Sequence, residues 1–279
     1  MTTIVLFLFL TLCFCPADVR AQQNGFFDSN YVLSYYGNPN SKKMGILGDH
    51  PPEKLAELIK IKAAEYSRLN PDKGVIGAFH IVYATVHPEG RVGYVSEATI
   101  KQYIEVAKNN GMLVFLDHQL GCLPLEKAIS DLARYAKFQN VHFALDPEWR
   151  TANPGKTIGS LSGQDINRAQ EIMAQYLQKN QINEKKILVL HQFRYDMLTE
   201  RNLIRADFPG LQLVHTMDGF GPPFLKQDSY KFNALAKNLP LKGFKLFYND
   251  RGSWSFDRPL MSPAEVLALK PQPVLIIYQ

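Results

Sequence analysis

The sequence predicts a (β/α)8 barrel, the fold in which eight parallel strands close into a cylinder inside a ring of helices. Three observations favour this fold: eight short apolar runs occur along the chain, helix-compatible segments separate each successive pair, and polar residues gather where the runs end. Such alternation is typical of parallel strands that are covered on both faces. An open doubly wound sheet is the alternative, because counting runs does not prove that the sheet closes.

The amino end carries the features of a secretory signal. Residues 4–15 form an apolar run that is too short to span a bilayer comfortably, and Pro16 and the small-residue site Val19-Arg20-Ala21 follow it. We therefore expect a signal peptide over 1–21 and a single barrel domain over 22–279. The prediction is a secreted or periplasmic protein without a transmembrane anchor after cleavage.

Cysteine and charge usage fit this location. Cleavage removes Cys13 and Cys15 and leaves Cys122 as the only thiol, so the mature chain is predicted to contain no intrachain disulfide. The net charge is +5, but the Lys and Arg residues are scattered rather than gathered in a stripe. Nucleic acid is therefore not an expected partner.

Each predicted strand is an apolar run bounded by loop or helix signals. In order, the runs are 31–37, 75–85, 112–121, 141–149, 187–193, 211–219, 243–250 and 273–279. Between the first two runs, Pro51 and Pro52 open an amphipathic helix that reaches about Ser67. A helix over 96–110 stops at Asn109-Asn110-Gly111, and further helices are expected near 125–138 and over 162–180. The usual final helix is predicted to be missing, and residues 22–30 are a candidate to cover that gap.

Polar side chains fall where the predicted strands end, which is where barrel enzymes place their active sites. The strongest feature is Asp146-Pro147-Glu148, which closes the fourth run. In a strand, alternate side chains point the same way, so Asp146 and Glu148 are expected to share a face. Crowding two carboxylates raises the proton affinity of at least one, as a general acid requires. The simpler interpretation is a capping Asp followed by a surface Glu.

The other strand ends supply candidate substrate-binding residues. Flat aromatic rings flanked by acids and amides suit sugars, which have apolar C–H faces and hydroxylated rims, so a polysaccharide or other glycan is the predicted ligand. The polar candidates are Asp117, His191, Gln192, His215, Asp218, Asn249 and Asp250, and the aromatic candidates are Tyr35, Tyr36, Trp149 and Trp254.

With this motif and architecture, the chain resembles glycoside hydrolase-like (β/α)8 barrels, notably the chitinase-like enzymes and the lysozyme-like barrel muramidases. The resemblance implies that Glu148 is the proton donor, with Asp146 beside it as a tuner or as the stabiliser of an oxocarbenium-like centre. The exact family stays unassigned. Val141 and Ala144 stand where the chitinase pattern has further acids, and the run 31–37 has no early Asp of the muramidase type.

Two other functions stay open. A metal-dependent hydrolase would use His191 and His215 as ligands, with Asp117, Asp218 or Asp250 completing the shell. A non-catalytic glycan-binding barrel would keep the aromatic residues and lack the proton chemistry. Because the sequence displays no complete metal-ligand set and no nucleotide motif, no cofactor is expected.

Overall fold

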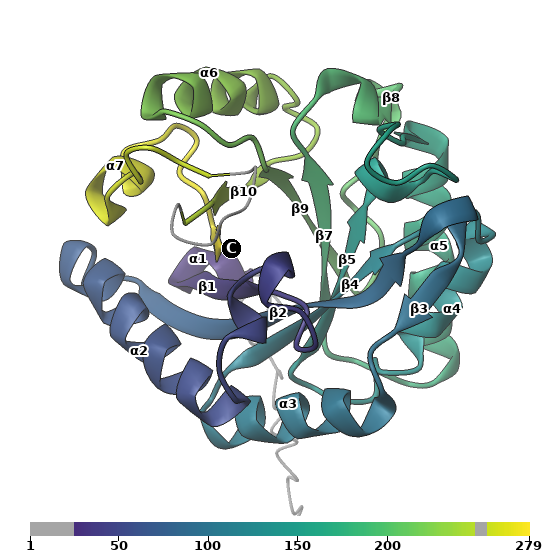
Figure 1. Ribbon diagram of the computed structural model, residues 1–279, viewed down its shortest axis with the longest axis horizontal. Helices are drawn as coiled ribbons and strands as arrows, with labels where there is room; N and C mark the ends of the chain where they lie inside the picture. The colour runs from purple at the N-terminus through teal and green to yellow at the C-terminus, as the bar shows by residue number, and fades with distance from the viewer. Residues whose placement is uncertain (1–24, 249–255) are drawn as a thin grey trace, which may run out of the picture.

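The protein folds as a closed parallel barrel of eight strands, each of which pairs with two neighbours. A computed structural model describes residues 25–248 and 256–279. The barrel strands follow the order β1, β11, β10, β9, β7, β5, β4 and β2, and β1 pairs with β2 to close the ring. Figure 1 looks along the barrel, with the helices arranged around the strands. The predicted fold class is confirmed.

The strands are short and nearly all parallel. The barrel strands are β1 (Asn30–Gly37), β2 (Gly74–Val86), β4 (Leu113–Gln119), β5 (Val141–Asp146), β7 (Lys186–Gln192), β9 (Leu211–Met217), β10 (Leu241–Leu246) and β11 (Leu275–Tyr278). The strand β3 (Val92–Tyr94) pairs antiparallel with the end of β2. Outside the barrel, β6 (Leu161–Ser162) pairs with β8 (Leu198–Thr199).

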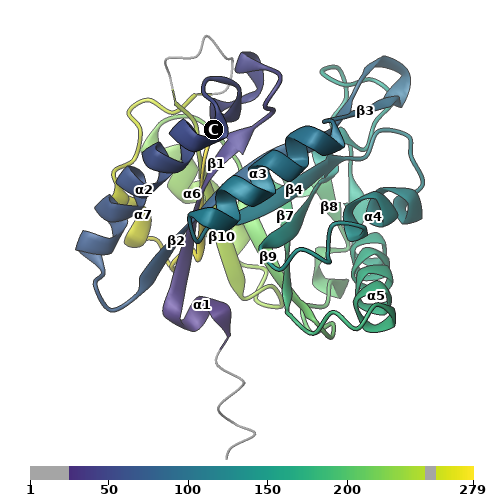
Figure 2. The ribbon, with the colours of Figure 1, turned by 90° about the horizontal axis from the view of Figure 1, so that it is seen from below.

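Helices cover the outside of the barrel and one of its ends. The helices are α1 (Phe26–Ser29), α2 (Pro52–Leu69), α3 (Glu97–Asn109), α4 (Leu125–Ala133), α5 (Gly163–Lys179), α6 (Pro223–Ala234) and α7 (Pro263–Leu267). Ser96 caps α3, because its hydroxyl accepts a hydrogen bond from the Thr99 backbone N–H at 3.1 Å. Figure 2 shows α1 beyond the end of the barrel at which β1 begins, and Phe27 packs into the barrel interior.

Strand alternation divides the core into two layers. One cluster fills the barrel and contains Val32, Tyr36, Ala78, Phe115, Ala144, Val189, Val214 and Ile277. A larger cluster fills the space between the strands and the helices, and it contains Leu33, Tyr35, Phe79, Leu116 and Leu213. Neighbouring residues on one strand therefore belong to different layers. This rule decides which polar side chains can reach a site at the centre of the barrel.

Two details of the predicted element pattern were wrong. The segment between β7 and β9 holds the 3-10 turns Tyr195–Met197 and Arg201–Leu203 and the short strand β8, where a helix-compatible segment was expected. The fourth strand ends at Asp146, because Pro147 cannot donate to the strand ladder and opens a 3-10 turn over Pro147–Trp149. No helix follows β11 within the described residues, and α1 lies in the segment proposed to cover that gap.

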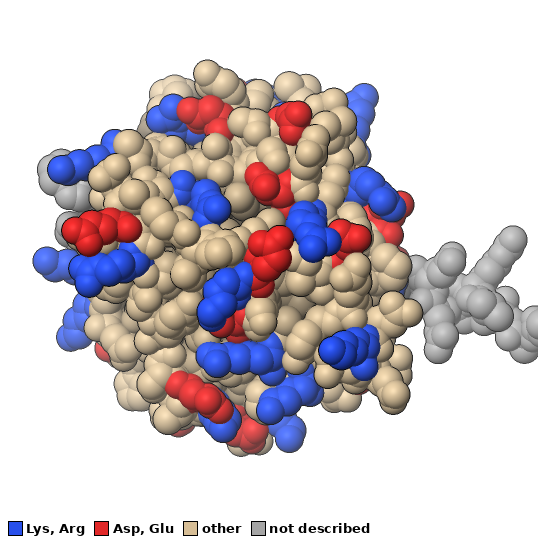
Figure 3. Space-filling model, turned by 90° about the vertical axis from the view of Figure 1, so that its right-hand side faces the viewer, with Lys and Arg blue, Asp and Glu red and all other residues tan. Residues whose placement is uncertain are grey.

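The visible surface mixes charges of both signs. Figure 3 shows Lys and Arg interspersed with Asp and Glu over the side of the barrel that carries α4 and α5. Several of these charges pair locally, for example Arg168 with Glu171 at 2.8 Å. Among the described residues, none of the helices combines the length and apolar character that a membrane span requires.

Candidate active site

The turn after β5 carries the two carboxylates that the sequence singles out. The Asp146 side chain accepts a hydrogen bond from the Glu148 backbone N–H at 3.3 Å and so caps the 3-10 turn. Asp146 ends a strand and is buried, whereas Glu148 lies on the turn and is partly exposed. Simple alternation predicted that the two acids share a strand face. They do not, because Glu148 lies on the turn beyond the end of the strand. Asp146 is a cap, as in the simpler interpretation, but Glu148 is not a surface residue.

Both acids open into one pocket at the carboxyl end of the barrel. The pocket has a volume of about 600 Å³, and Tyr36, Asp146, Glu148, Trp149, Asp218 and Lys245 are among its lining residues. Phe193, Phe220 and Phe247 add apolar surface to the same walls. Its size is typical of small-molecule sites, which are mostly apolar with a few convergent polar groups. Another hollow, lined by Phe26 and His142 among others, lies at the opposite end of the barrel and contains none of these acids.

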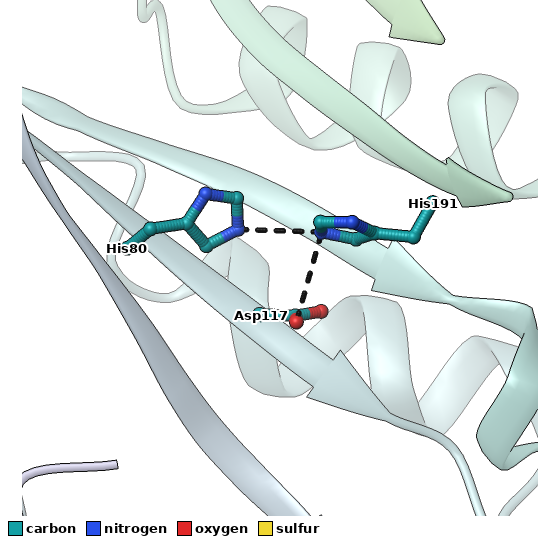
Figure 4. A group of neighbouring side chains, drawn as sticks. All are labelled: His80, Asp117 and His191. Atoms are coloured by element: carbon teal, nitrogen blue, oxygen red, sulfur yellow. Dashed lines mark hydrogen bonds and ion pairs between the residues drawn. The ribbon is translucent and has the colours of Figure 1, made fainter. Parts of the chain in front are cut away.

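A buried polar network lies next to the pocket inside the barrel. The Tyr36 hydroxyl donates a hydrogen bond to Asp117 Oδ2 at 2.7 Å. His191 Nδ1 lies 2.7 Å from Asp218 Oδ2, and His191 Nε2 lies 3.7 Å from Asp117 Oδ2. The Lys245 ammonium lies 3.4 Å from Asp218 Oδ2 and 3.6 Å from the centre of the Tyr36 ring. Residues on or directly after six strands (β1, β2, β4, β7, β9 and β10) therefore form one cluster, whose His80, Asp117 and His191 are drawn in Figure 4.

Burial separates the proton affinities of the pocket acids. Burial, reinforced by the charges of Glu148 and Asp117, raises the pKa of Asp146 well above its ordinary value. Burial also raises the pKa of Glu148, and the positive charge of Lys245 offsets part of that increase. Asp146 is the more deeply buried of the two acids, and the pKa of Glu148 is raised further by the charge of Asp218.

Asp218, which follows β9, has surroundings that favour the ionised carboxylate. Although burial opposes ionisation, His191 and Lys245 lower the pKa of Asp218 below its ordinary value. Burial also disfavours a charged imidazole at His191, but Asp218 and Asp117 outweigh it and raise the pKa of His191 to about 9. The pocket therefore combines proton-retaining acids on β5 and its turn with an ionised carboxylate just after β9.

Three predicted binding residues lie on the wrong side of their strands. Tyr35 packs among the residues between strands and helices, and its ring lies edge-on to Tyr278. His215 and Gln192 bond to each other at 2.7 Å, and His215 Nδ1 also lies 3.2 Å from the Lys242 ammonium. All three side chains face the helices, so we correct their assignment as ligand-binding residues. The metal site built on His191 and His215 fails for the same reason, since the two rings point to different layers.

Other predicted residues are found at or beside the pocket, or lie outside the described ranges. Tyr36, Asp146, Glu148, Trp149 and Asp218 line the pocket, and Asp117 and His191 are buried beside it. Asn249, Asp250 and Trp254 lie outside the described residues, as does the signal segment 1–21. Their predicted roles stay predictions.

The sequence interpretation missed two residues of the cluster. His80 lies in the middle of β2 rather than at its end, so a search of strand ends passed over it. Its position between Ala78 and Val82, which both face the barrel interior, was the signal that could have identified it. Lys245 was missed because the predicted seventh strand extended to Asp250, whereas β10 ends at Leu246.

Comparison with known proteins places the fold. No family model matches the chain, and no curated protein sequence matches it. Among solved structures, a GH18 chitinase from Pseudoalteromonas aurantia is similar with a TM-score of 0.51 and 10% identity, covering 88% of this chain and 93% of that one. The chain shares the barrel fold of glycoside hydrolases. A triply substituted endo-β-1,4-glucanase from Xanthomonas axonopodis pv. citri gives a TM-score of 0.52 at 13% identity, covering 89% of this chain and 88% of that one. The predicted resemblance is confirmed at the level of the fold.

Proposed function

We propose that the protein is a glycoside hydrolase in which Glu148 donates a proton to the glycosidic oxygen. The observation that carries the proposal is the position of Glu148: a partly exposed carboxyl with a raised pKa that opens into the pocket at the carboxyl end of the barrel. A general acid must keep its proton near the working pH and must reach the leaving group. Burial raises the pKa of Glu148, and the 3-10 turn places its carboxyl group at the pocket.

Asp146 and Asp218 have different roles in this proposal. Asp146 fixes the turn through its hydrogen bond to the Glu148 backbone. Because its pKa is raised, Asp146 is less suited to stabilise a positive centre than Asp218, whose pKa is lowered and which lines the same pocket. Carboxyl groups whose pKa values are pushed apart by their surroundings are the pattern that glycosidic chemistry uses for acid and charge stabilisation.

The pocket walls favour a polysaccharide as the substrate. Trp149 and Tyr36 provide aromatic surface beside Glu148, and Phe220 and Phe247 extend it. Aromatic rings can contact the apolar faces of sugar rings while carboxylates and Lys245 bond to hydroxyl groups. The neighbours with similar folds are a chitinase and an endo-β-1,4-glucanase, so β-linked glycans are the first class to test.

Export belongs to the same proposal, because a polysaccharide substrate would lie outside the cytoplasm. The apolar run 4–15 and the small residues before Gln22 support cleavage after Ala21. Mass spectrometry of the protein from culture medium or periplasm should give a chain that begins near Gln22. Recovery of the chain with Met1 still attached would contradict this part of the proposal.

The activity is tested on a panel of chitin, cellulose, mannan and peptidoglycan. We expect new reducing ends from at least one member of the panel, and the anomer formed first in an NMR time course gives the stereochemical outcome. Binding to a glycan without any cleavage would instead favour the non-catalytic glycan-binding barrel. Neither binding nor cleavage across the panel would contradict both functions for these substrate classes.

A further inference from the structure

A second chemical feature lies beside the proposed acid, inside the barrel. In the part of the chain that the structure describes, His80, Asp117 and His191 bring one potential ligand atom each within 4.8 Å of one another. His80 Nε2 lies 3.4 Å from His191 Nε2, and His191 Nε2 lies 3.7 Å from Asp117 Oδ2. Figure 4 shows the three side chains converging from their strands. We propose that His80, Asp117 and His191 form a binding site for a divalent transition-metal ion.

The spacing of the ligand atoms suits such an ion. Ligands held at about 2.0–2.1 Å from a tetrahedral zinc ion lie about 3.3 Å from one another. The separations of 3.4 and 3.7 Å are close to that value, so small side-chain rotations would complete the set. Two imidazoles and one carboxylate favour zinc and neighbouring transition metals over calcium or magnesium, which prefer oxygen ligands.

The surroundings orient the ligands as they are oriented in metal sites. The Asp218 carboxylate bonds to His191 Nδ1 at 2.7 Å, which leaves Nε2 directed at the cluster. A carboxylate on the second nitrogen of a ligating histidine is the common arrangement around zinc. The Tyr36 hydroxyl similarly holds Asp117 at 2.7 Å. Two ligands therefore have partners that fix their orientation.

Two buried atoms of the cluster also have hydrogen-bonding capacity that a cation or its bound water could use. Among the described residues, His80 Nδ1 and Asp117 Oδ1 are buried atoms without a hydrogen-bond partner. Buried polar atoms of this kind are uncommon and call for an explanation such as an ion or a water molecule.

The proposed metal site lies next to the pocket. Tyr36 lines the pocket and also bonds to Asp117, so the ligands lie one side chain below the pocket floor. Three protein ligands are typical of sites that keep a position open for water or another ligand. The proposal does not depend on glycosidase activity, since binding is measured directly.

To test the proposal, the full chain is first treated with a chelator. Binding of Zn²⁺ is then measured by calorimetry, and binding of Co²⁺ is measured by visible absorption. We expect one ion per chain with a Kd of about 1 μM or tighter, and Co²⁺ bands of a low-coordinate site. His80→Gln and Asp117→Asn should each weaken binding by about 100-fold, and Asp218→Asn by about 10–100-fold. His142→Gln is the matched control, because His142 is also buried within the barrel but bonds to the Ile187 backbone N–H.

Two results would overturn the proposal. The first is the lack of binding at about 1 mM Zn²⁺. The second is that His80→Gln and Asp117→Asn bind Zn²⁺ as tightly as the unchanged protein does, which would indicate an adventitious surface site at exposed His50 or His87. If the variants fail to fold, X-ray absorption of the Zn²⁺-loaded unchanged protein decides. Two imidazole ligands and an oxygen support the site, and fewer than two imidazoles contradict it.

Discussion

The carboxylate of Asp146 accepts a hydrogen bond from the backbone N–H of Glu148, two residues further along the chain. This contact joins the end of β5 to the 3-10 turn that carries Glu148 to the pocket. Burial and the neighbouring acids keep Asp146 protonated to higher pH than an ordinary Asp. One residue therefore fixes the position of the proposed acid and couples stability to pH.

Replacing Asp146 with Asn should change how stability depends on pH. A raised folded-state pKa means that the unfolded chain loses the Asp146 proton first, so the free energy of unfolding falls as pH rises from the ordinary value toward the raised one. Asn keeps the hydrogen-bond acceptor and cannot ionise. Urea denaturation of Asp146→Asn should therefore show a stability advantage over the unchanged protein that grows with pH. The exposed Asp72→Asn is the control, and a pH-independent difference at position 146 would contradict the assignment.

Lys245 should set the upper pH limit of activity. Its positive charge lowers the pKa of Glu148 against the effect of burial. Removing that charge in Lys245→Met should let Glu148 keep its proton to higher pH, so the basic limb of kcat/KM should move upward. Lys43→Met is the matched control, because Lys43 lines the same pocket. A basic limb that stays in place in Lys245→Met, or moves downward, argues against Glu148 as the acid.

Trp149 should contribute to binding more than to folding. It lines the pocket beside Glu148 and is only partly buried. Trp149→Ala is expected to weaken glycan binding by about 10-fold, which corresponds to ~1.4 kcal/mol of ring contact. Isothermal titration should show no comparable loss for Tyr195→Ala, whose ring is 73% exposed. A large fall in thermal stability with unchanged affinity would make Trp149 a packing residue, and the same test applies to Trp254.

A buried ion pair should hold two pocket loops in place. Lys226 and Asp257 lie 3.0 Å apart with fully buried side chains. The Lys226 ammonium also donates hydrogen bonds to the backbone carbonyls of Gly219 and Lys245 at 2.6 and 2.7 Å. Lys245 lines the pocket, and Gly219 lies between the lining residues Asp218 and Phe220. Lys226→Met should lower the free energy of unfolding by about 3–5 kcal/mol, since it leaves Asp257 charged and buried.

The exposed pair of Lys54 and Glu57 supplies the control for that measurement. Its ammonium and carboxylate lie 2.8 Å apart on the surface of α2. Lys54→Met should change stability by less than about 1 kcal/mol, because solvent screens exposed ion pairs. Equal losses in Lys226→Met and Lys54→Met would show that burial does not strengthen the inner pair.

The fold was predictable because apolar runs of strand length alternate with helix-compatible segments along the chain, whereas the site was predictable only in part. Tyr35 and Tyr36 necessarily face opposite sides of β1, but both sides are apolar in a barrel strand, so the sequence cannot tell which ring reaches the interior. The same ambiguity placed His215 in the site and left out Thr216, which bonds to Asp218 at 2.5 Å. The alternation of Ala78, His80 and Val82 could place His80 on the same face as its neighbours, but its proximity to Asp117 and His191 could not be read from a single sequence.

The most direct measurement compares Glu148→Gln with Glu105→Gln on whichever glycan the unchanged protein cleaves. Gln keeps the shape of Glu148 and its hydrogen-bonding reach but cannot donate the proton, and Glu105 is an exposed residue on α3. The account predicts that kcat falls about 10²–10⁴-fold in Glu148→Gln while the Kd and the unfolding midpoint change little. Glu105→Gln should behave as the unchanged protein does. Full turnover in Glu148→Gln would contradict the role of Glu148 as the proton donor.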